Sequence, residues 1–209
     1  MSDYIWISKS LFDVSNWRAL TSDLAERDKA GAIACGERND KGESLGPECF
    51  PTAIWPADNA RKSDTSKGKD FFYAGTHWIV SGRFAQLMQD FEMGGTHFYP
   101  VQFLHADRQT PVGGEWFCLN FGNVKDALLP DQSTGLYRTS IRREGWTVAS
   151  SNENLISFSP AAGQGSDLWF DARLKQVFCL SARLGDAMIE TGIIKGFKGL
   201  GELIRARIV

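Results

Sequence analysis

The histidines are the first residues to test for chemistry in this chain, because imidazole is a common metal ligand and catalytic base. There are three of them, His77, His97 and His105. None stands at metal-ligand spacing from a cysteine or from another histidine, and eight residues of strand would separate His97 from His105 by about 27 Å. The sequence therefore predicts no metal site, and no motif in it predicts a cofactor.

The cysteines and the glycine-rich loop offer the next candidates. Cys118 and Cys179 lie in apolar, strand-like runs, where a thiol is usually inert packing. Gly163, Gln164 and Gly165 lack the third glycine of a dinucleotide fingerprint and the lysine of a phosphate loop, so they predict a connector. The chain also lacks a G-x-S-x-G elbow. We expect no catalytic residue.

The composition narrows the class of protein. The net charge is −2 with no basic run, which argues against a nucleic-acid partner. No apolar run has the length of a membrane span. The four scattered cysteines form no C-x-x-C pair and follow no apolar leader, so we expect reduced, mostly buried thiols in a cytoplasmic protein: Cys35, Cys49, Cys118 and Cys179.

Two stretches one hundred positions apart share one pattern of residue types. Residues 78–88 and 178–188 each contain an apolar triplet, a serine, a small residue, an arginine and an apolar helical face. Each apolar triplet has the character of a strand. Ser81 and Ser181 stand where a side chain accepts a hydrogen bond from the first turn of a helix. The sequence therefore predicts a duplicated strand–Ser–helix unit with these two serines as N-caps.

Arg83 and Arg183 are unusual in this pattern. A cation in the first turn faces the positive end of the helix dipole, at a cost of a few tenths of a kcal/mol to about 1 kcal/mol. We therefore expect each arginine to bind a carboxylate or carbonyl partner as a structural tether. A ligand-binding role is the alternative.

The first third of the chain changes character along its length. Residues 14–30 carry apolar side chains at helical spacing, and Gly31 follows as a stop, which predicts one helix. Residues 36–70 are dominated by Gly, Pro, Asn, Asp, Lys and Ser. Such a composition predicts a long polar loop, which is either functional or disordered.

Regular structure is predicted again from residue 71, beginning with a strand over residues 71–80. Short strands alternate there with a few helices. The fold class predicted is α+β, a mixed and largely antiparallel sheet with a few packed helices. We expect residues 1–70 to pack as a strand, a helix and a loop on a main domain formed by residues 71–209.

The part of the chain from about residue 70 to residue 200 resembles a family of bacterial immunity proteins from polymorphic-toxin and contact-dependent competition systems, formerly a domain of unknown function and number eleven in the immunity series. Three groups of residues carry the resemblance: Ile79-Val80-Ser81-Gly82-Arg83-Phe84, Gly95-Thr96-His97-Phe98-Tyr99-Pro100-Val101, and Asp167-Leu168-Trp169-Phe170 with Cys179-Leu180-Ser181-Ala182-Arg183-Leu184. Leu119-Asn120 and Gly196-Phe197 fit two further positions of the pattern. The resemblance implies a protein that binds a co-encoded toxin and blocks it by occlusion, and it names no catalytic residue.

Partner recognition is predicted in residues 36–70, which the resemblance does not cover. Long loops on a rigid body are where changeable contact surface is usually found. Trp55 is either a packing residue or a buried anchor of the interface. Four acidic residues would complement a basic toxin cleft and speed association: Glu43, Glu48, Asp58 and Asp64.

Two other functions remain open at this level. One is an enzyme of unidentified type with a cleft near His77, His97 and Asp167. The other is a non-catalytic, ligand-binding regulator. The leading hypothesis is a cytoplasmic toxin inhibitor of interbacterial competition, of undetermined oligomeric state, with neither a nucleic-acid nor a membrane partner.

Overall fold

The computed structural model describes residues 2–9, 16–60, 69–138, 145–149, 154–194 and 203–209. The fold is α+β and contains two compact units, each assembled from separate stretches of chain. Unit 1 comprises Met1–Asp13, Phe91–Gly94 and Asn123–Val209, and unit 2 comprises Val14–Asp90 and Gly95–Gly122. Residue 70, the boundary predicted from the sequence, lies within unit 2.

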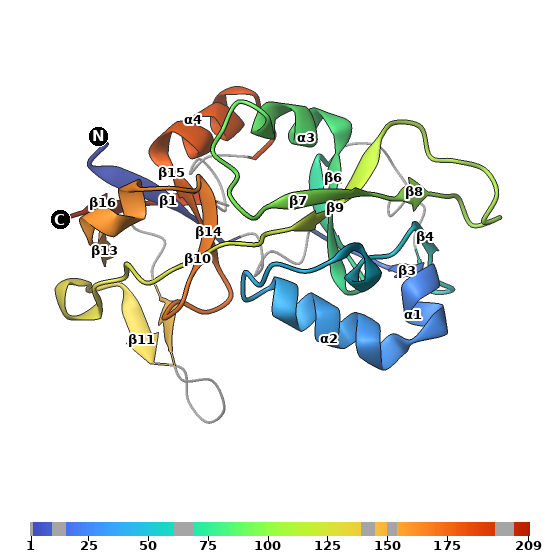
Figure 1. The fold of residues 1–209 in the computed structure, drawn as a ribbon, viewed down its shortest axis with the longest axis horizontal. Helices are drawn as coiled ribbons and strands as arrows, with labels where there is room; N and C mark the ends of the chain where they lie inside the picture. The colour runs from blue at the N-terminus through green and yellow to red at the C-terminus, as the bar shows by residue number, and fades with distance from the viewer. Residues whose placement is uncertain (1, 10–15, 61–68, 139–144, 150–153, 195–202) are drawn as a thin grey trace. The chain divides into compact units, whose positions relative to one another are not determined.

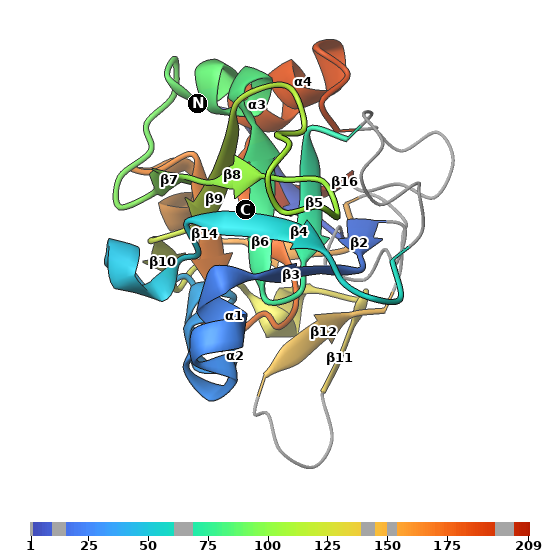
Figure 2. The same ribbon diagram turned by 90° about the vertical axis from the view of Figure 1, so that its right-hand side faces the viewer.

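Unit 2 contains a five-stranded sheet of order β2-β5-β6-β9-β7 and a three-stranded sheet of order β3-β4-β8 (Figure 2). The strands of the larger sheet are Trp17–Arg18 (β2), Phe71–Ala74 (β5), His77–Ser81 (β6), Trp116–Asn120 (β9) and His97–Pro100 (β7). Those of the smaller sheet are Leu20–Ser22 (β3), Ala53–Pro56 (β4) and Gln102–Phe103 (β8). The helices are Asp23–Arg27 (α1), Lys29–Asn39 (α2), the short 3-10 helix Pro47–Cys49 (η2) and Gly82–Met88 (α3).

Unit 1 contains a six-stranded sheet of order β10-β14-β15-β1-β16-β13 and a two-stranded sheet, β11-β12. The strands of the larger sheet are Val124–Lys125 (β10), Leu168–Asp171 (β14), Phe178–Ser181 (β15), Tyr4–Ser8 (β1), Leu203–Ile208 (β16) and Ser157–Phe158 (β13). The hairpin is Leu136–Arg138 (β11) with Trp146–Val148 (β12). The helices are Ala182–Glu190 (α4) and the 3-10 helices Pro130–Gln132 (η4) and Pro160–Gly163 (η5). Figure 1 shows β1 running between β15 and β16.

The helix predicted over residues 14–30 is wrong at both ends. β2 and β3 occupy the first part of that range, because they pair with β5 and β4. Ser22 begins α1 as its N-cap, and its Oγ accepts a hydrogen bond from the Ala25 N–H at 3.1 Å. α2 then continues past Gly31 to Asn39. Strand pairing has here overridden a helical spacing of apolar residues.

The single strand predicted over residues 71–80 is instead the β5–β6 hairpin. Gly75 forms its turn with a φ of 65°, which glycine adopts without strain. Phe71 faces Val80 across the pair. The apolar run is continuous because both strands of this hairpin are buried.

The duplicated unit predicted from the sequence is present, and it includes more than the predicted elements. In unit 2 the β5–β6 hairpin precedes α3, and in unit 1 the β14–β15 hairpin precedes α4. Asp70 stands just before the first hairpin and Asp167 just before the second. In each copy the residue after the aspartate pairs with the residue before the capping serine.

The strands that flank the two hairpins also match in register. β2 runs parallel to β5, and β10 runs parallel to β14, each starting at the third residue after the aspartate. β6 pairs with β9 through Ser81 and Trp116, while β15 pairs with β1 through Ser181 and Ile5. β4 pairs in parallel with β8 as β13 does with β16. The two units are therefore one fold built twice.

A cation over an aromatic ring recurs at the same place in both copies. The Arg18 guanidinium lies 4.4 Å from the ring centroid of Phe72, and the Lys125 ammonium lies 3.6 Å from that of Trp169. Both cations are the second residue of the parallel edge strand. Such contacts contribute about 0.5–2 kcal/mol.

The N-terminal strand completes unit 1 from a distant place in the sequence. β1 occupies in unit 1 the position that β9 occupies in unit 2, although β9 follows its own helix in the chain. Ile5 and Ile7 are 1% and 0% exposed. β1 is therefore part of the core of unit 1.

Each capping serine belongs to a small network with its aspartate and arginine. The Ser81 Oγ accepts from the Phe84 N–H at 3.2 Å and donates to an Asp70 carboxylate oxygen at 2.6 Å, and Arg83 donates to the other oxygen at 3.2 Å. In unit 1, Ser181 caps α4 through the Leu184 N–H, and Arg183 binds both oxygens of Asp167. The predicted caps and carboxylate partners of the arginines are thus confirmed.

Removing either cap is expected to destabilise its helix moderately. We expect Ser81→Ala and Ser181→Ala each to lower the free energy of unfolding by about 1 kcal/mol, because an N–H of the first turn loses its acceptor. Urea titration followed by tryptophan fluorescence measures the loss. Two variants as stable as the wild type would contradict the role of the caps.

Candidate functional site

The residues of the enzyme hypothesis each have a structural task. His77 is 1% exposed, and its Nε2 lies 2.8 Å from the Cys49 carbonyl oxygen while its Nδ1 lies 2.7 Å from the Thr76 hydroxyl. His97 is exposed, and its Nδ1 lies 2.8 Å from the Gly95 carbonyl oxygen. His77 and His97 belong to unit 2, and Asp167 belongs to unit 1. Neither unit brings the three together.

Asp167 is bound through both carboxylate oxygens by Arg183. Burial favours a higher pKa for this carboxyl group, but hydrogen bonds from Arg183, Ser181 and the Glu92 N–H outweigh it and hold the pKa below its ordinary value. The side chain of Asp167 is 4% exposed. This carboxylate fixes the start of α4 and the segment around Glu92.

Two buried cysteines and one lysine also have structural rather than chemical roles. Burial raises the pKa values of Cys118 and Cys179, so both thiols stay protonated and poorly nucleophilic at neutral pH. Burial lowers the pKa of Lys125 to about 8, while its ammonium donates to the carbonyl oxygens of Ala162 and Ser166 at 3.1 and 2.8 Å. Lys125 therefore holds both ends of the glycine-rich loop by hydrogen bonds.

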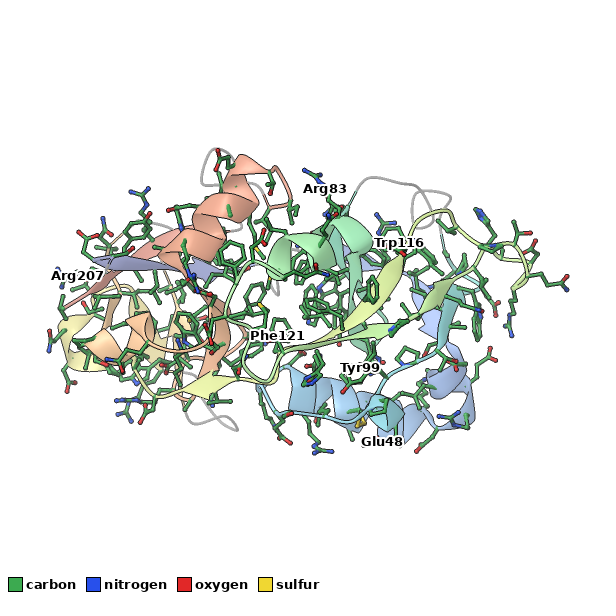
Figure 3. The ribbon with its side chains drawn as sticks, turned by 45° about the horizontal axis from the view of Figure 1, so that its top comes forward. Glu48, Arg83, Tyr99, Trp116, Phe121 and Arg207 are labelled. Atoms are coloured by element: carbon green, nitrogen blue, oxygen red, sulfur yellow. A yellow bond between two sulfur atoms is a disulfide. The ribbon has the colours of Figure 1, made fainter. Side chains whose placement is uncertain are left out.

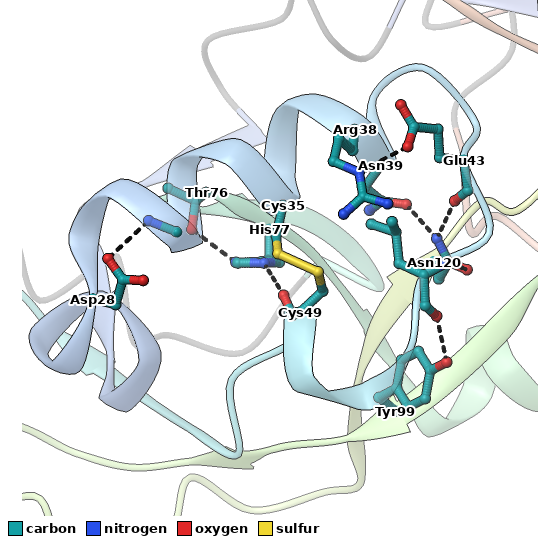
Figure 4. The surroundings of a disulfide bond; sticks show 12 residues. Asp28, Cys35, Arg38, Asn39, Glu43, Cys49, Thr76, His77, Tyr99 and Asn120 are labelled. Atoms are coloured by element: carbon teal, nitrogen blue, oxygen red, sulfur yellow. Dashed lines mark hydrogen bonds and ion pairs between the residues drawn. A yellow bond between two sulfur atoms is a disulfide. The ribbon is translucent and has the colours of Figure 1, made fainter.

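A disulfide in unit 2 corrects the prediction of four reduced thiols. Cys35 on α2 is bonded to Cys49 on η2, with 5.3 Å between their Cα atoms and a sequence separation of 14 (Figure 4). Gly36 lets the helix approach closely here, because a Cβ on it would lie 2.3 Å from the Thr76 carbonyl oxygen. The loop between α2 and η2 is therefore closed at its base.

Two asparagines hold the same loop from inside. The Asn39 amide donates to the Leu119 carbonyl oxygen at 2.8 Å, and its oxygen accepts from Asn120 at 2.9 Å. Asn120 also donates to the Glu43 carbonyl oxygen at 2.8 Å and accepts from the Leu45 N–H at 3.2 Å. Figure 4 shows this network beside the disulfide. Sequence reasoning placed Asn120 in a pattern but gave no role to it or to Asn39.

The segment predicted as a long polar loop is therefore largely structured over its described part. It contains the end of α2, then η2 and β4. Glu43 is half-buried and pairs with Arg38 at 2.7 Å. Glu48 on η2 and Asp58 after β4 are exposed, and Figure 3 shows Glu48 pointing away from the body of unit 2. Asp64 lies outside the described residues.

Trp55 is a packing residue in this structure. It lies in β4 and is 6% exposed. The guanidinium of Arg108 lies 4.7 Å from the centroid of its ring. The indole is therefore covered, and the surface of unit 2 does not present it as an anchor.

An exposed aromatic residue that sequence reasoning assigned to a helix lies instead on an edge strand. Trp17 on β2 is 56% exposed, and its ring centroid lies 5.8 Å from that of Tyr73. Burial raises the pKa of Tyr73, and the carboxylates of Asp40 and Glu37 raise it further. Tryptophan is enriched in protein interfaces, so an exposed tryptophan is a candidate contact residue. A strand of two residues is too short to show the alternation of buried and exposed residues by which a strand is predicted from sequence.

A metal site and a membrane-spanning helix are two further kinds of feature to consider among the described residues. Over the described ranges, no group of three or more His, Cys, Asp or Glu side chains could hold a metal ion. Within the same residues, no helix has the length and apolar character needed to span a membrane.

The comparison with protein families identifies the chain. The model of the Immunity protein family (Imm11) matches residues 56–200. A search of curated proteins finds no significant match. The matched range includes both capping serines, both arginines and Asn120, whereas α1, α2 and the disulfide precede it. The chain therefore belongs to the Immunity protein family (Imm11).

Proposed function

We propose that this protein neutralises a bacterial toxin or secreted effector by binding it and covering its active surface. The observation that carries this proposal is the family match over residues 56–200. It is also supported by the structural contacts that His77, His97 and Asp167, the residues of the enzyme hypothesis, make within the fold. A stable block of this kind needs about 1,200–2,000 Å² of total buried surface with a few aromatic or arginine anchors.

The experiment that tests the proposal is co-expression with the neighbouring gene, which the proposal expects to encode the toxin. Induction of the toxin alone should stop bacterial growth, and co-expression of this protein should restore it. A purified, inactivated toxin should co-elute with the protein from a size-exclusion column. Growth arrest that persists despite folded, abundant protein, with no complex formed, would refute the proposed function.

We place the electrostatic part of recognition on the exposed carboxylates Glu48 and Asp58, together with the half-buried Glu43. Unit 2 carries inserted helices and a disulfide between its β3 and β4 strands, where unit 1 carries the β11–β12 hairpin. The two copies differ most in these insertions, and loops on a common scaffold are where binding specificity usually lies. Asp64 belongs to the same proposal through its sequence position.

Reversing these charges should slow association with a basic toxin. For Glu48→Lys with Asp58→Lys we expect a roughly 10-fold lower association rate at low salt and a weaker dependence on salt. Stopped-flow mixing measures both. Glu190→Lys with Asp131→Lys makes the same change in net charge on exposed residues of unit 1 and serves as the control. Replacing residues 63–69 with a Gly-Ser linker tests Asp64, and unchanged rates in both test variants would move the interface elsewhere.

The cytoplasm remains the proposed location, on the basis of the sequence composition. The Cys35–Cys49 disulfide is the feature that favours an oxidising compartment instead, because disulfides rarely persist against cellular dithiols. The state of this pair in cells, trapped by rapid alkylation, distinguishes the two locations.

A further inference from the structure

Unit 2 has a groove between α3 and β9 that none of the functions above uses. Its volume is about 570 Å³, and its lining includes Arg83, Gln86, Gln89, Glu115 and Phe117. Figure 3 shows two labelled members of the lining, Arg83 and Trp116, beside each other at the α3 end of the sheet. Gln86, Gln89 and Glu115 are exposed, and Phe117 is half-buried.

The duplication shows which residues of unit 1 stand at the corresponding positions. Ser81 pairs with Trp116, and Ser181 pairs with Ile5. One position further along the strand, Phe117 corresponds to Trp6. One position earlier, Glu115 corresponds to Tyr4. On the helices, Gln86 and Asp186 both follow the capping serine by five residues.

Unit 1 fills this place with its own aromatic side chains. The Tyr4 hydroxyl donates to one oxygen of Asp186 at 2.5 Å, and the Trp6 indole N–H donates to the other at 3.0 Å. The two rings meet edge to face with 5.8 Å between their centroids. Gly185 makes room for Trp6, because a Cβ on it would lie 2.0 Å from the indole Cδ1. Arg205 then covers the ring of Tyr4 at 4.6 Å.

Unit 2 has a different residue at each position that fills the site in unit 1. Tyrosine is replaced by Glu115, tryptophan by Phe117, and the covering arginine by Pro100, which pairs with Phe117 as Arg205 pairs with Trp6. Gln86 remains on the helix as a hydrogen-bond acceptor in place of the carboxylate. The same backbone therefore surrounds a hollow with an apolar floor and a polar helix wall.

We propose that this groove receives a tyrosine side chain of the toxin. The ring would pack on Phe117 and α3, and its hydroxyl would donate to the Gln86 amide oxygen as Tyr4 donates to Asp186. Arg83 and Glu115 contribute opposite charges to the lining, so the groove suits a neutral aromatic group better than a charged one. This inference rests on the proposed function, and its groove shares no residue with the acidic set of Glu43, Glu48 and Asp58.

The test introduces into the groove of unit 2 the side-chain types that fill the corresponding site of unit 1. Glu115→Tyr with Gln86→Asp should place a phenol and a carboxylate as Tyr4 and Asp186 are placed, and so close the groove from within. We expect binding of the inactivated toxin encoded by the adjoining gene to weaken by at least roughly 30-fold, the loss typical of an interface hot spot. The melting temperature should be unchanged or higher.

The control makes the same two substitutions away from the groove. Glu190→Tyr with Gln164→Asp alters exposed residues of unit 1 and should bind the toxin as the wild type does. Gln89→Trp is a second variant, in which one exposed helix residue of the lining is enlarged to block the groove. Its toxin binding tests the inference if the double variant fails to fold. A protein that protects cells and binds toxin equally well with the groove filled overturns this inference alone. A wild-type protein that neither binds nor protects overturns the proposed function instead.

Discussion

Leu184→Ala is expected to lower the free energy of unfolding by about 2–5 kcal/mol, and Phe84→Ala by about 3–5 kcal/mol. Leu184 is 0% exposed and Phe84 is 2% exposed. Both are the first large apolar residue of a helix in the duplicated unit, three positions after the capping serine. Each truncation would leave a cavity that the surrounding strands cannot close.

The two truncations report on different parts of the molecule. Phe84 stacks on Phe71 at 5.8 Å within unit 2, whereas Leu184 belongs to unit 1. Urea unfolding measured by fluorescence and by circular dichroism gives the loss for each variant. Glu190→Ala, on the exposed side of α4, is the control and should change stability by less than about 0.5 kcal/mol. Wild-type melting of both truncated proteins would show that these helices do not pack as described.

Acidification from pH 6.5 to pH 4 is expected to remove about 3 kcal/mol of stability through His77. Burial lowers the pKa of this imidazole from 6.5 to about 4, although the hydrogen bond to the Cys49 carbonyl oxygen acts in the other direction. Between these two values the unfolded chain binds a proton that the folded protein does not. Unfolding is therefore favoured as the pH falls, and the stability from His77 is fully present only above pH 6.5.

A substitution isolates this effect from the other titrating groups. His77→Gln should be less stable than the wild type at pH 7 but should lose less stability on acidification to pH 4. Burial raises the pKa of Asp171, which opposes the trend in both proteins alike, so the difference between them belongs to His77. Parallel pH profiles for the two proteins would contradict the assignment.

The sequence by itself determined the local signals of the duplicated unit. A serine that follows an apolar run and precedes a helical spacing of apolar residues has one favourable use, the N-cap, and Ser81 and Ser181 both have it. The need of Arg83 and Arg183 for acidic partners also followed from the helix dipole, since a first-turn cation is unfavourable alone. The range that matches the immunity family, residues 56–200, contains both of these serines and both arginines.

Other local predictions failed where strands were too short to show a period. β2 has two residues and β3 has three, so their apolar residues were read together as one helical face. α2 continues through Gly31 and Gly36. Gly36 is needed there for the close approach of Thr76, a contact distant in sequence. Burial likewise turned Trp55 into a packing residue and left Trp17 exposed, which residue type alone does not distinguish.

Only the tertiary structure decided how the two copies are completed and how they differ. β1 enters unit 1 at the position that β9 fills in unit 2, and the Cys35–Cys49 disulfide closes the insertion of unit 2. Strand pairing and disulfide formation depend on which segments meet in space, and loop closure over long separations leaves no periodic trace in the sequence. The groove beside α3 also depends on the tertiary structure. Strand register makes Glu115 correspond to Tyr4, and the groove is open because the side chains of unit 2 do not fill the space that Tyr4 and Trp6 fill in unit 1.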